Sequence, residues 1–223
     1  MGAAIGQSLP VAVGVLISPL PIVAVVLMLV SGRARANALA FVVGWFVAVL
    51  ALVAVVALVA GNATPDDGGP ATWTGWLKIV LGVLLVALGV RQWRGRPRGD
   101  AEPPAPAWMA AIERFTPARS AGLAVLLGAV NPKNLLLVVS GGAAIAAAAP
   151  GDTSATVVAA LVFAVVASAG VVTPVVIYVA LGSRAGPVLD ELRSWMVRNN
   201  AAIMAVLLLV LGAKMLGDGI SVL

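Results

Sequence analysis

The chain has 223 residues, of which 61% are hydrophobic and only 10% are charged. A soluble globular domain is about half apolar and about a quarter charged, so this composition indicates an integral membrane protein. Cysteine and histidine are both absent, which removes disulfides and the usual ligands of zinc or copper, and we expect neither a metal nor a cofactor. The formal charge of +5 does not indicate nucleic-acid binding, because most basic residues stand at the ends of apolar segments.

Six apolar segments follow one another along the chain. A helix that spans a bilayer needs roughly 20 predominantly apolar residues. The sequence therefore predicts an all-α integral membrane protein with six transmembrane helices. The first six residues lack the basic region of a cleavable signal, so we expect the first segment to be retained as a helix. The segments lie at about residues 8–30, 38–61, 75–92, 120–147, 155–181 and 200–217.

The arginines predict the orientation of the chain in the membrane. With six spans, the first, third and fifth connections share one side, and all eleven arginines stand in or beside them. The opposite connections carry Asp66, Asp67 and Asp152 instead. The positive-inside rule then places the arginine-bearing connections in the cytoplasm and both termini outside a cytoplasmic membrane.

The third connection, residues 93–119, separates two halves of three spans each. Its first part is rich in proline, glycine and charge, which is typical of a flexible linker. Residues 108–115 place apolar side chains at helical spacing and predict a short interfacial helix, and residues 188–196 of the fifth connection have a similar pattern. Such helices either anchor the connections or gate a cytoplasmic entrance. The predicted halves are residues 1–92 and 120–223.

Each half begins with an apolar segment that a polar residue and a proline interrupt. The interruptions are Ser18-Pro19-Leu20-Pro21 and Asn131-Pro132-Lys133-Asn134. Proline removes a backbone donor and clashes with the carbonyl four residues earlier, so Pro19, Pro21 and Pro132 are expected to break the first and fourth spans near the bilayer midplane. Their matching places predict two inverted three-helix repeats, and interrupted spans in corresponding places point to a transporter's binding site.

A further proline, Pro174, is expected to break the regular helix of the fifth span by kinking it. It follows Thr173, and Gly170 lies four residues earlier, where a small residue accommodates the proline ring. A kink that serves packing is the main explanation for this proline.

Lys133, Asn131, Asn134 and Ser18 form the predicted substrate site. Lys133 lies about 20 Å along an ideal helix from the start of its span, and a lysine at the bilayer centre costs at least about 2.5 kcal/mol, so it usually faces a cavity or a partner. Ser18 and Asn131 are good N-cap residues before a proline. A lysine beside two helix N-termini suits an anion such as phosphate, sulfate or carboxylate.

Structural explanations for these four residues remain open. Backbone carbonyls freed by the breaks would satisfy Lys133, and Asn134 would serve equally well by bonding the broken backbone. Capping alone explains Ser18 about as well as substrate binding does.

The six-span layout with Asn131-Pro132-Lys133 at a break resembles the lysine-exporter superfamily. Within it, the chain is most similar to the small actinobacterial glycolipid-addressing proteins, also called sulfolipid-addressing proteins. The resemblance implies a role in moving glycolipids or related envelope lipids toward the cell surface. Ser18-Pro19-Leu20-Pro21 departs from the Pro-Gly-Pro pattern of the amino-acid exporters, which argues against an amino-acid substrate.

The leading hypothesis is a translocase that moves a glycolipid or related anionic envelope lipid by alternating access around the midplane site. The alternatives are an exporter of amino acids or other small metabolites, and a membrane scaffold for lipid-synthesis or export machinery. Expected partners are the lipid substrate, a second copy of the chain, or envelope-lipid export proteins. An enzyme is not expected, because no intramembrane carboxylate pair, serine–histidine pair or HExxH pattern is present.

Overall fold

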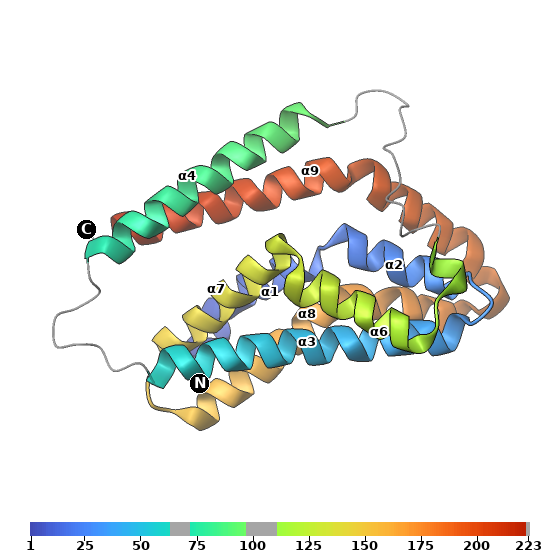
Figure 1. The fold of residues 1–223 in the computed structure, drawn as a ribbon, viewed down its shortest axis with the longest axis horizontal. Coiled ribbons are helices and arrows are strands. Elements are labelled where there is room, and N and C mark those ends of the chain that lie inside the picture. Colours follow the sequence, from blue (N-terminus) through green and yellow to red (C-terminus); the bar gives the residue numbers. More distant parts are fainter. Residues whose placement is uncertain (63–71, 97–110, 222–223) are drawn as a thin grey trace. The chain divides into compact units, whose positions relative to one another are not determined.

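The computed structural model describes residues 1–62, 72–96 and 111–221, and this part of the chain is helical and contains no strand (Figure 1). The all-α prediction is thus confirmed for the described residues. The elements are α1 (Gly2–Leu16), α2 (Pro19–Leu29), α3 (Ala34–Asn62), α4 (Thr72–Arg94), η1 (Ile112–Arg114), α6 (Pro117–Val125), η2 (Leu126–Val130), α7 (Pro132–Ala148), α8 (Thr153–Leu181), η3 (Gly182–Arg184) and α9 (Ala185–Ile220).

The surface of these helices is that of a membrane protein. Large apolar side chains are widely exposed, as at Val43, Val165 and Val179, where 61%, 60% and 72% of the residue surface is accessible. Exposed apolar surface on this scale indicates a nonpolar surrounding. By length and hydropathy, the described residues contain two helical stretches able to cross a bilayer, Ala34–Gly61 and Thr153–Ile220, or up to four if each of two bent helix pairs is one span.

The chain bends at both of the predicted breaks. The axes of α1 and α2 differ by 53° across Ile17 and Ser18, and the axis of Pro117–Val130 differs by 63° from that of α7 across Asn131. In the second break the turn before Asn131 is a π-helix, Leu126–Val130, which the sequence did not predict. Asn131 N–H donates to the Leu126 carbonyl five residues earlier, as a π-helical turn requires.

Pro174 does not end a helix, and the kink predicted there stays a prediction. Pro174 is buried inside α8, which continues as one helix from Thr153 to Leu181. Proline removes one backbone hydrogen bond, and α8 retains its other bonds and its packing against α1, α2 and α3. The Thr173 hydroxyl also donates to the Ala169 carbonyl at 2.8 Å, so it adds a contact within the same turn.

Three predicted segments have other bounds or another form in the structure. The first helix starts at Gly2 and contains Pro10, so its N-terminal turn lies before the predicted apolar segment. Residues 188–196 do not form a separate interfacial helix, because α9 runs from Ala185 to Ile220 without a break. Of the predicted interfacial helix 108–115, only the end lies within the described residues, where Ile112–Arg114 is a 3₁₀ turn.

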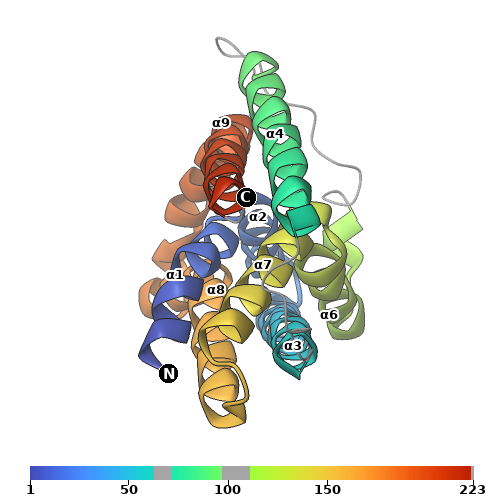
Figure 2. The same ribbon diagram turned by 90° about the vertical axis from the view of Figure 1, so that its left-hand side faces the viewer.

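The chain divides by its contacts into two compact units, and the first contains Met1–Ala63 and Ala105–Met196. In this unit α7 and α8 each pack against both α1 and α3, while α6 packs along α3 (Figure 2). Phe41, Trp45 and Phe163 are among the largest fully buried side chains, and the rings of Phe41 and Trp45 stack with centroids 6.3 Å apart. These aromatic side chains form the centre of the first unit.

The second unit contains Thr64–Pro104 and Val197–Leu223, and it pairs α4 with the C-terminal part of α9. The two helices run antiparallel, because Gly82 faces Gly212 while Gly89 faces Ala205. An added Cβ at Gly82 would lie 3.0 Å from the Gly212 carbonyl oxygen, and one at Gly212 would lie 2.9 Å from that of Gly82. Small residues therefore let the two backbones touch, as in membrane helix pairs.

These two units group the chain differently from the repeats that the sequence predicts. Contacts place α4 and the end of α9 together, whereas the repeats 1–92 and 120–223 would each contain one of them. A repeat is defined by similarity between two parts of the chain, whereas a unit is defined by contacts in the folded structure. The units therefore do not test the repeat boundaries, which stay a prediction.

The α4–α9 contact predicts opposite outcomes for two glycines of the same helix. Gly212→Ala would bring its Cβ to 2.6 Å from Val86 Cγ2, so we expect a loss of about 1–3 kcal/mol in the free energy of unfolding. Gly217→Ala meets no atom within 4 Å and should be neutral or stabilising by up to about 1 kcal/mol. Thermal unfolding of the two purified variants in detergent measures the difference, and equal melting temperatures would contradict the close contact.

Candidate anion site at the junction of the two breaks

Each break starts a new helix whose first residues are set by a cap and a proline. Ser18 is the N-cap of α2, with Pro19 directly after it, and Asn131 is the N-cap of α7, with Pro132 directly after it. Proline suits the first helical position because it fixes φ and its missing N–H would have no partner there. The sequence therefore creates two internal helix N-termini, each of which carries partial positive charge.

A chain of hydrogen bonds joins the two breaks. Ser18 Oγ donates to Asn134 Oδ1 at 2.8 Å, across 116 residues of sequence. Asn134 Nδ2 donates to the Leu127 carbonyl at 2.7 Å. Ser18 and Asn134 are only 3% and 1% exposed, so these bonds satisfy polar groups that have little access to solvent. The junction thus holds α2, the π-turn and α7 together.

Lys133 points its charged end at the same junction. Its Nζ donates to Ser18 Oγ at 3.0 Å, and its backbone N–H donates to Asn131 Oδ1 at 3.1 Å. The lysine is half-buried. Within the described residues it forms no ion pair, so one bond to a hydroxyl leaves two of its three N–H donors for another acceptor.

The structure brings together all four residues of the predicted substrate site. Asn131 caps α7 through its side chain, as expected. Ser18 also stands at the N-cap position, but its hydroxyl makes no capping bond and is used for Asn134 instead. Asn134 bonds the broken backbone at Leu127, which is the structural explanation left open above. That these residues bind a substrate stays a prediction.

The prolines of the site differ in their surroundings. Pro19 and Pro21 are buried within the first unit, whereas Pro132 is exposed at the start of α7. Pro174 belongs to the continuous helix α8 and does not contribute a helix end.

Gly170 lies against the end of α1 beside the junction, whereas the sequence pattern explained this glycine by the ring of Pro174. A Cβ at Gly170 would overlap the carbonyl oxygen of Leu16, the last residue of α1. The backbone of α8 therefore lies directly against the broken end of α1. No pattern in one sequence announces this contact, because the two residues are far apart along the chain.

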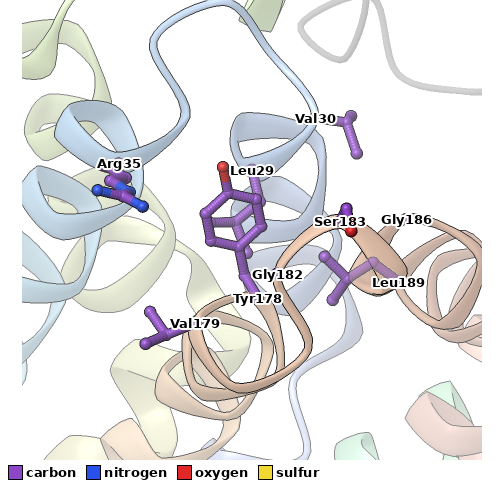
Figure 3. Close-up of a pocket in the computed structure, with 9 residues that line it drawn as sticks. All are labelled: Leu29, Val30, Arg35, Tyr178, Val179, Gly182, Ser183, Gly186 and Leu189. Atoms are coloured by element: carbon purple, nitrogen blue, oxygen red, sulfur yellow. The ribbon is translucent and has the colours of Figure 1, made fainter.

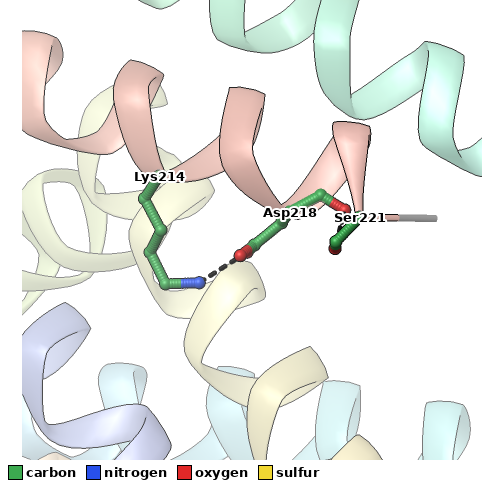
Figure 4. Close-up of polar contacts among 3 residues, drawn as sticks. All are labelled: Lys214, Asp218 and Ser221. Carbon is green, nitrogen blue, oxygen red and sulfur yellow. Dashed lines mark hydrogen bonds and ion pairs between the residues drawn. The ribbon is translucent and has the colours of Figure 1, made fainter. Parts of the chain in front are cut away.

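Another lysine, Lys214, has a different environment in the second unit. Its Nζ lies 2.6 Å from Asp218 Oδ2, one turn later on α9 (Figure 4). Both side chains are about half exposed, at 49% and 47%. An exposed pair at this spacing contributes only about 0.3–0.5 kcal/mol. Lys214 is thus a charge-paired surface lysine, while Lys133 stands at a buried helix junction.

The arrangement defines a class of protein: an all-helical membrane protein with two broken helices whose N-termini and one lysine meet at a polar junction. The family model described as "Sap, sulfolipid-1-addressing protein" matches residues 9–221 of the chain. The match covers nearly the whole sequence, and the chain belongs to this family. Comparisons with curated proteins and with solved structures gave no match.

The junction predicts measurable coupling between Ser18 and Asn134. In a double-mutant cycle with Ser18→Ala and Asn134→Ala, we expect a coupling energy of about 0.5–2 kcal/mol, because each variant removes the same buried hydrogen bond. The measurement is the free energy of unfolding in mixed micelles. Thr173→Ala is the matched control, since its hydroxyl bonds only within α8, and it should add to Asn134→Ala within about 0.5 kcal/mol. Additivity in both pairs would mean that the junction bond contributes nothing.

Proposed function

We propose that the chain moves an anionic glycolipid, such as a sulfated one, across the cytoplasmic membrane, and that its headgroup passes the junction site. The observation that carries this proposal is the Lys133 ammonium on Ser18 between two helix N-termini. Membership of the sulfolipid-1-addressing family supports a role in addressing a sulfolipid or related glycolipid. A sulfate group supplies negative charge and several acceptor oxygens, which suit this set of donors.

The headgroup would bind where the chain has already met the cost of a buried cation. A charged lysine inside a membrane is energetically unfavourable, and a bound anion that pairs with Lys133 would reduce this unfavourable free energy. The N-termini of α2 and α7 add partial positive charge at the same place. The hydrocarbon tails of the lipid would stay among the membrane lipids, because the outer faces of α3 and α8 are apolar and exposed.

Movement would follow an alternating-access scheme in which two inverted repeats rock around the junction. Paired contacts support a repeat of this kind. The first helix of the first half, α1, packs on α8, and its counterpart in the second half, α6, packs on α3. The helical run Thr153–Ile220 has 68 residues, far more than the roughly 20 that one span needs, which supports counting more than one span there.

The orientation is part of the same proposal. The arginine-bearing connections would lie in the cytoplasm and both termini outside, as the positive-inside rule predicts. A lipid made inside the cell would then approach from the side where Arg33, Arg35 and Arg184 are exposed.

Lys133→Met tests this function directly. In liposomes that contain the purified chain, we expect outward movement of a fluorescently tailed sulfated glycolipid to slow by roughly tenfold or more, because the variant removes the cation from the junction. Lys133→Arg retains a charge and should retain part of the rate. The measurement is chemical quenching of the label in the outer leaflet.

Lys214→Met is the matched control. It makes the same change at a lysine in a surface ion pair and should leave the rate unchanged. Uptake of labelled amino acids is measured on the same liposomes. Uptake without lipid movement would assign the chain to the small-metabolite exporters. Absence of both activities in folded protein would favour a scaffold, and an unchanged rate in Lys133→Met would remove the junction from the pathway.

A further inference from the structure

A second polar site lies in the first unit, at the other end of α2 from the junction. It is a pocket of about 690 Å³ where α2 ends, α3 begins, α8 ends and α9 begins (Figure 3). Pockets that bind small molecules commonly measure about 300–1,000 Å³. Figure 3 shows the Tyr178 ring in the middle of the pocket, with Arg35 on one side and Ser183 and Leu189 on the other.

The charge of the pocket comes from Arg35 alone. No carboxylate is among its lining residues, and within the described part of the chain Arg35 forms no ion pair. The phenol of Tyr178 and the hydroxyl of Ser183 also line the pocket and can donate hydrogen bonds. A guanidinium is a planar fork of donors that fits the oxygens of phosphate, sulfate or carboxylate. The chemistry of the lining therefore matches an anion.

The rim of the pocket is apolar and open to its surroundings. Val30 and Val179 line the pocket while 53% and 72% of their surfaces are exposed. Leu29 and Leu189 add buried apolar walls. A pocket with one cation and an exposed apolar rim suits an amphiphile, whose head meets the arginine while its tail lies along the valines. A free inorganic anion would use only the polar part.

We propose that this pocket binds the anionic headgroup of a membrane lipid at a site separate from the Lys133 junction. Helix α2 sets the separation, because Leu29 of the pocket is its last residue and Ser18 of the junction is its N-cap. Its 11 residues span about 16 Å, roughly half of a 30 Å hydrocarbon core. The proposal goes beyond the proposed function, since binding at this pocket does not require that a lipid crosses the membrane.

The single tyrosine of the chain makes the pocket directly observable. Protein labelled with 3-fluorotyrosine gives one ¹⁹F resonance, from Tyr178, in neutral maltoside detergent. We expect dihexanoyl phosphatidic acid to shift this resonance saturably. Dihexanoyl phosphatidylcholine, which has no net charge, should cause no comparable shift, and inorganic phosphate should bind roughly tenfold more weakly or worse, because it cannot use the apolar rim.

Three variants separate the pocket from general charge effects. Arg35→Gln should weaken binding of phosphatidic acid roughly tenfold or more, while Arg33→Gln, two residues earlier and outside the lining, should leave affinity unchanged. Gly186→Leu should also abolish the shift, because a Cβ at Gly186 meets nothing within 4 Å and a larger side chain can enter the pocket without altering any charge. Thermal unfolding verifies that each variant is folded.

Four further outcomes would each overturn the proposal. Equal shifts with phosphatidylcholine would make the pocket a simple apolar groove, and equal affinity for inorganic phosphate would make it a free-anion site. Equal losses in Arg33→Gln and Arg35→Gln would assign the effect to loop charge. In Lys133→Met the shift should persist, and its loss would mean that the two sites are one. Failure of lipid movement in liposomes would leave this binding result intact, so the two proposals fail independently.

Discussion

The structure depends on one constraint, that polar backbone groups freed by a proline inside a membrane must find partners within the protein. At the second break, Asn134 supplies its side-chain amide to the Leu127 carbonyl, and Asn131 accepts the N–H of Lys133. At the first break, Ser18 turns its hydroxyl away from its own helix and toward Asn134. At the second break the freed backbone groups are thus satisfied by side chains of the same break, and Ser18 links the first break to them. The polar junction results from this requirement, and Lys133 stands within it.

The positions of the two breaks could be predicted from the sequence, because the effect of proline on a helix is local. At Pro174 the helix instead continues through the proline, where the turn gains a bond from Thr173 and α8 is packed along its length by other helices. The meeting of Ser18 with Asn134 could only be guessed from their matching places, since it depends on packing between segments 116 residues apart. Tertiary contacts thus decide which prolines end a helix and which a continuous helix accommodates.

The glycine contact of α4 and the pocket around Arg35 differ in how far the sequence could have predicted them. Glycines recur every seven residues in α4, at Gly75, Gly82 and Gly89, and this spacing could have predicted a close helix contact. The pocket around Arg35 and Tyr178 could not have been found in the same way. It needs the ends of four helices to converge, and its residues follow no spacing pattern in the sequence. Sequence patterns therefore predict the contact face of a single helix better than they predict a pocket formed by several helix ends.

Helix α2 runs from the Lys133 junction to the Arg35 pocket, and these two cationic sites differ in how far their cation is buried. Arg35 is exposed, so an anion bound there would keep much of its water, whereas an anion bound at the half-buried Lys133 would lose more of it. Helix N-termini lie at both sites, those of α2 and α7 at the junction and those of α3 and α9 at the pocket, so burial rather than helix dipoles distinguishes the two sites. In the proposed scheme, the exposed arginine would capture a headgroup and the half-buried lysine would hold it during its passage.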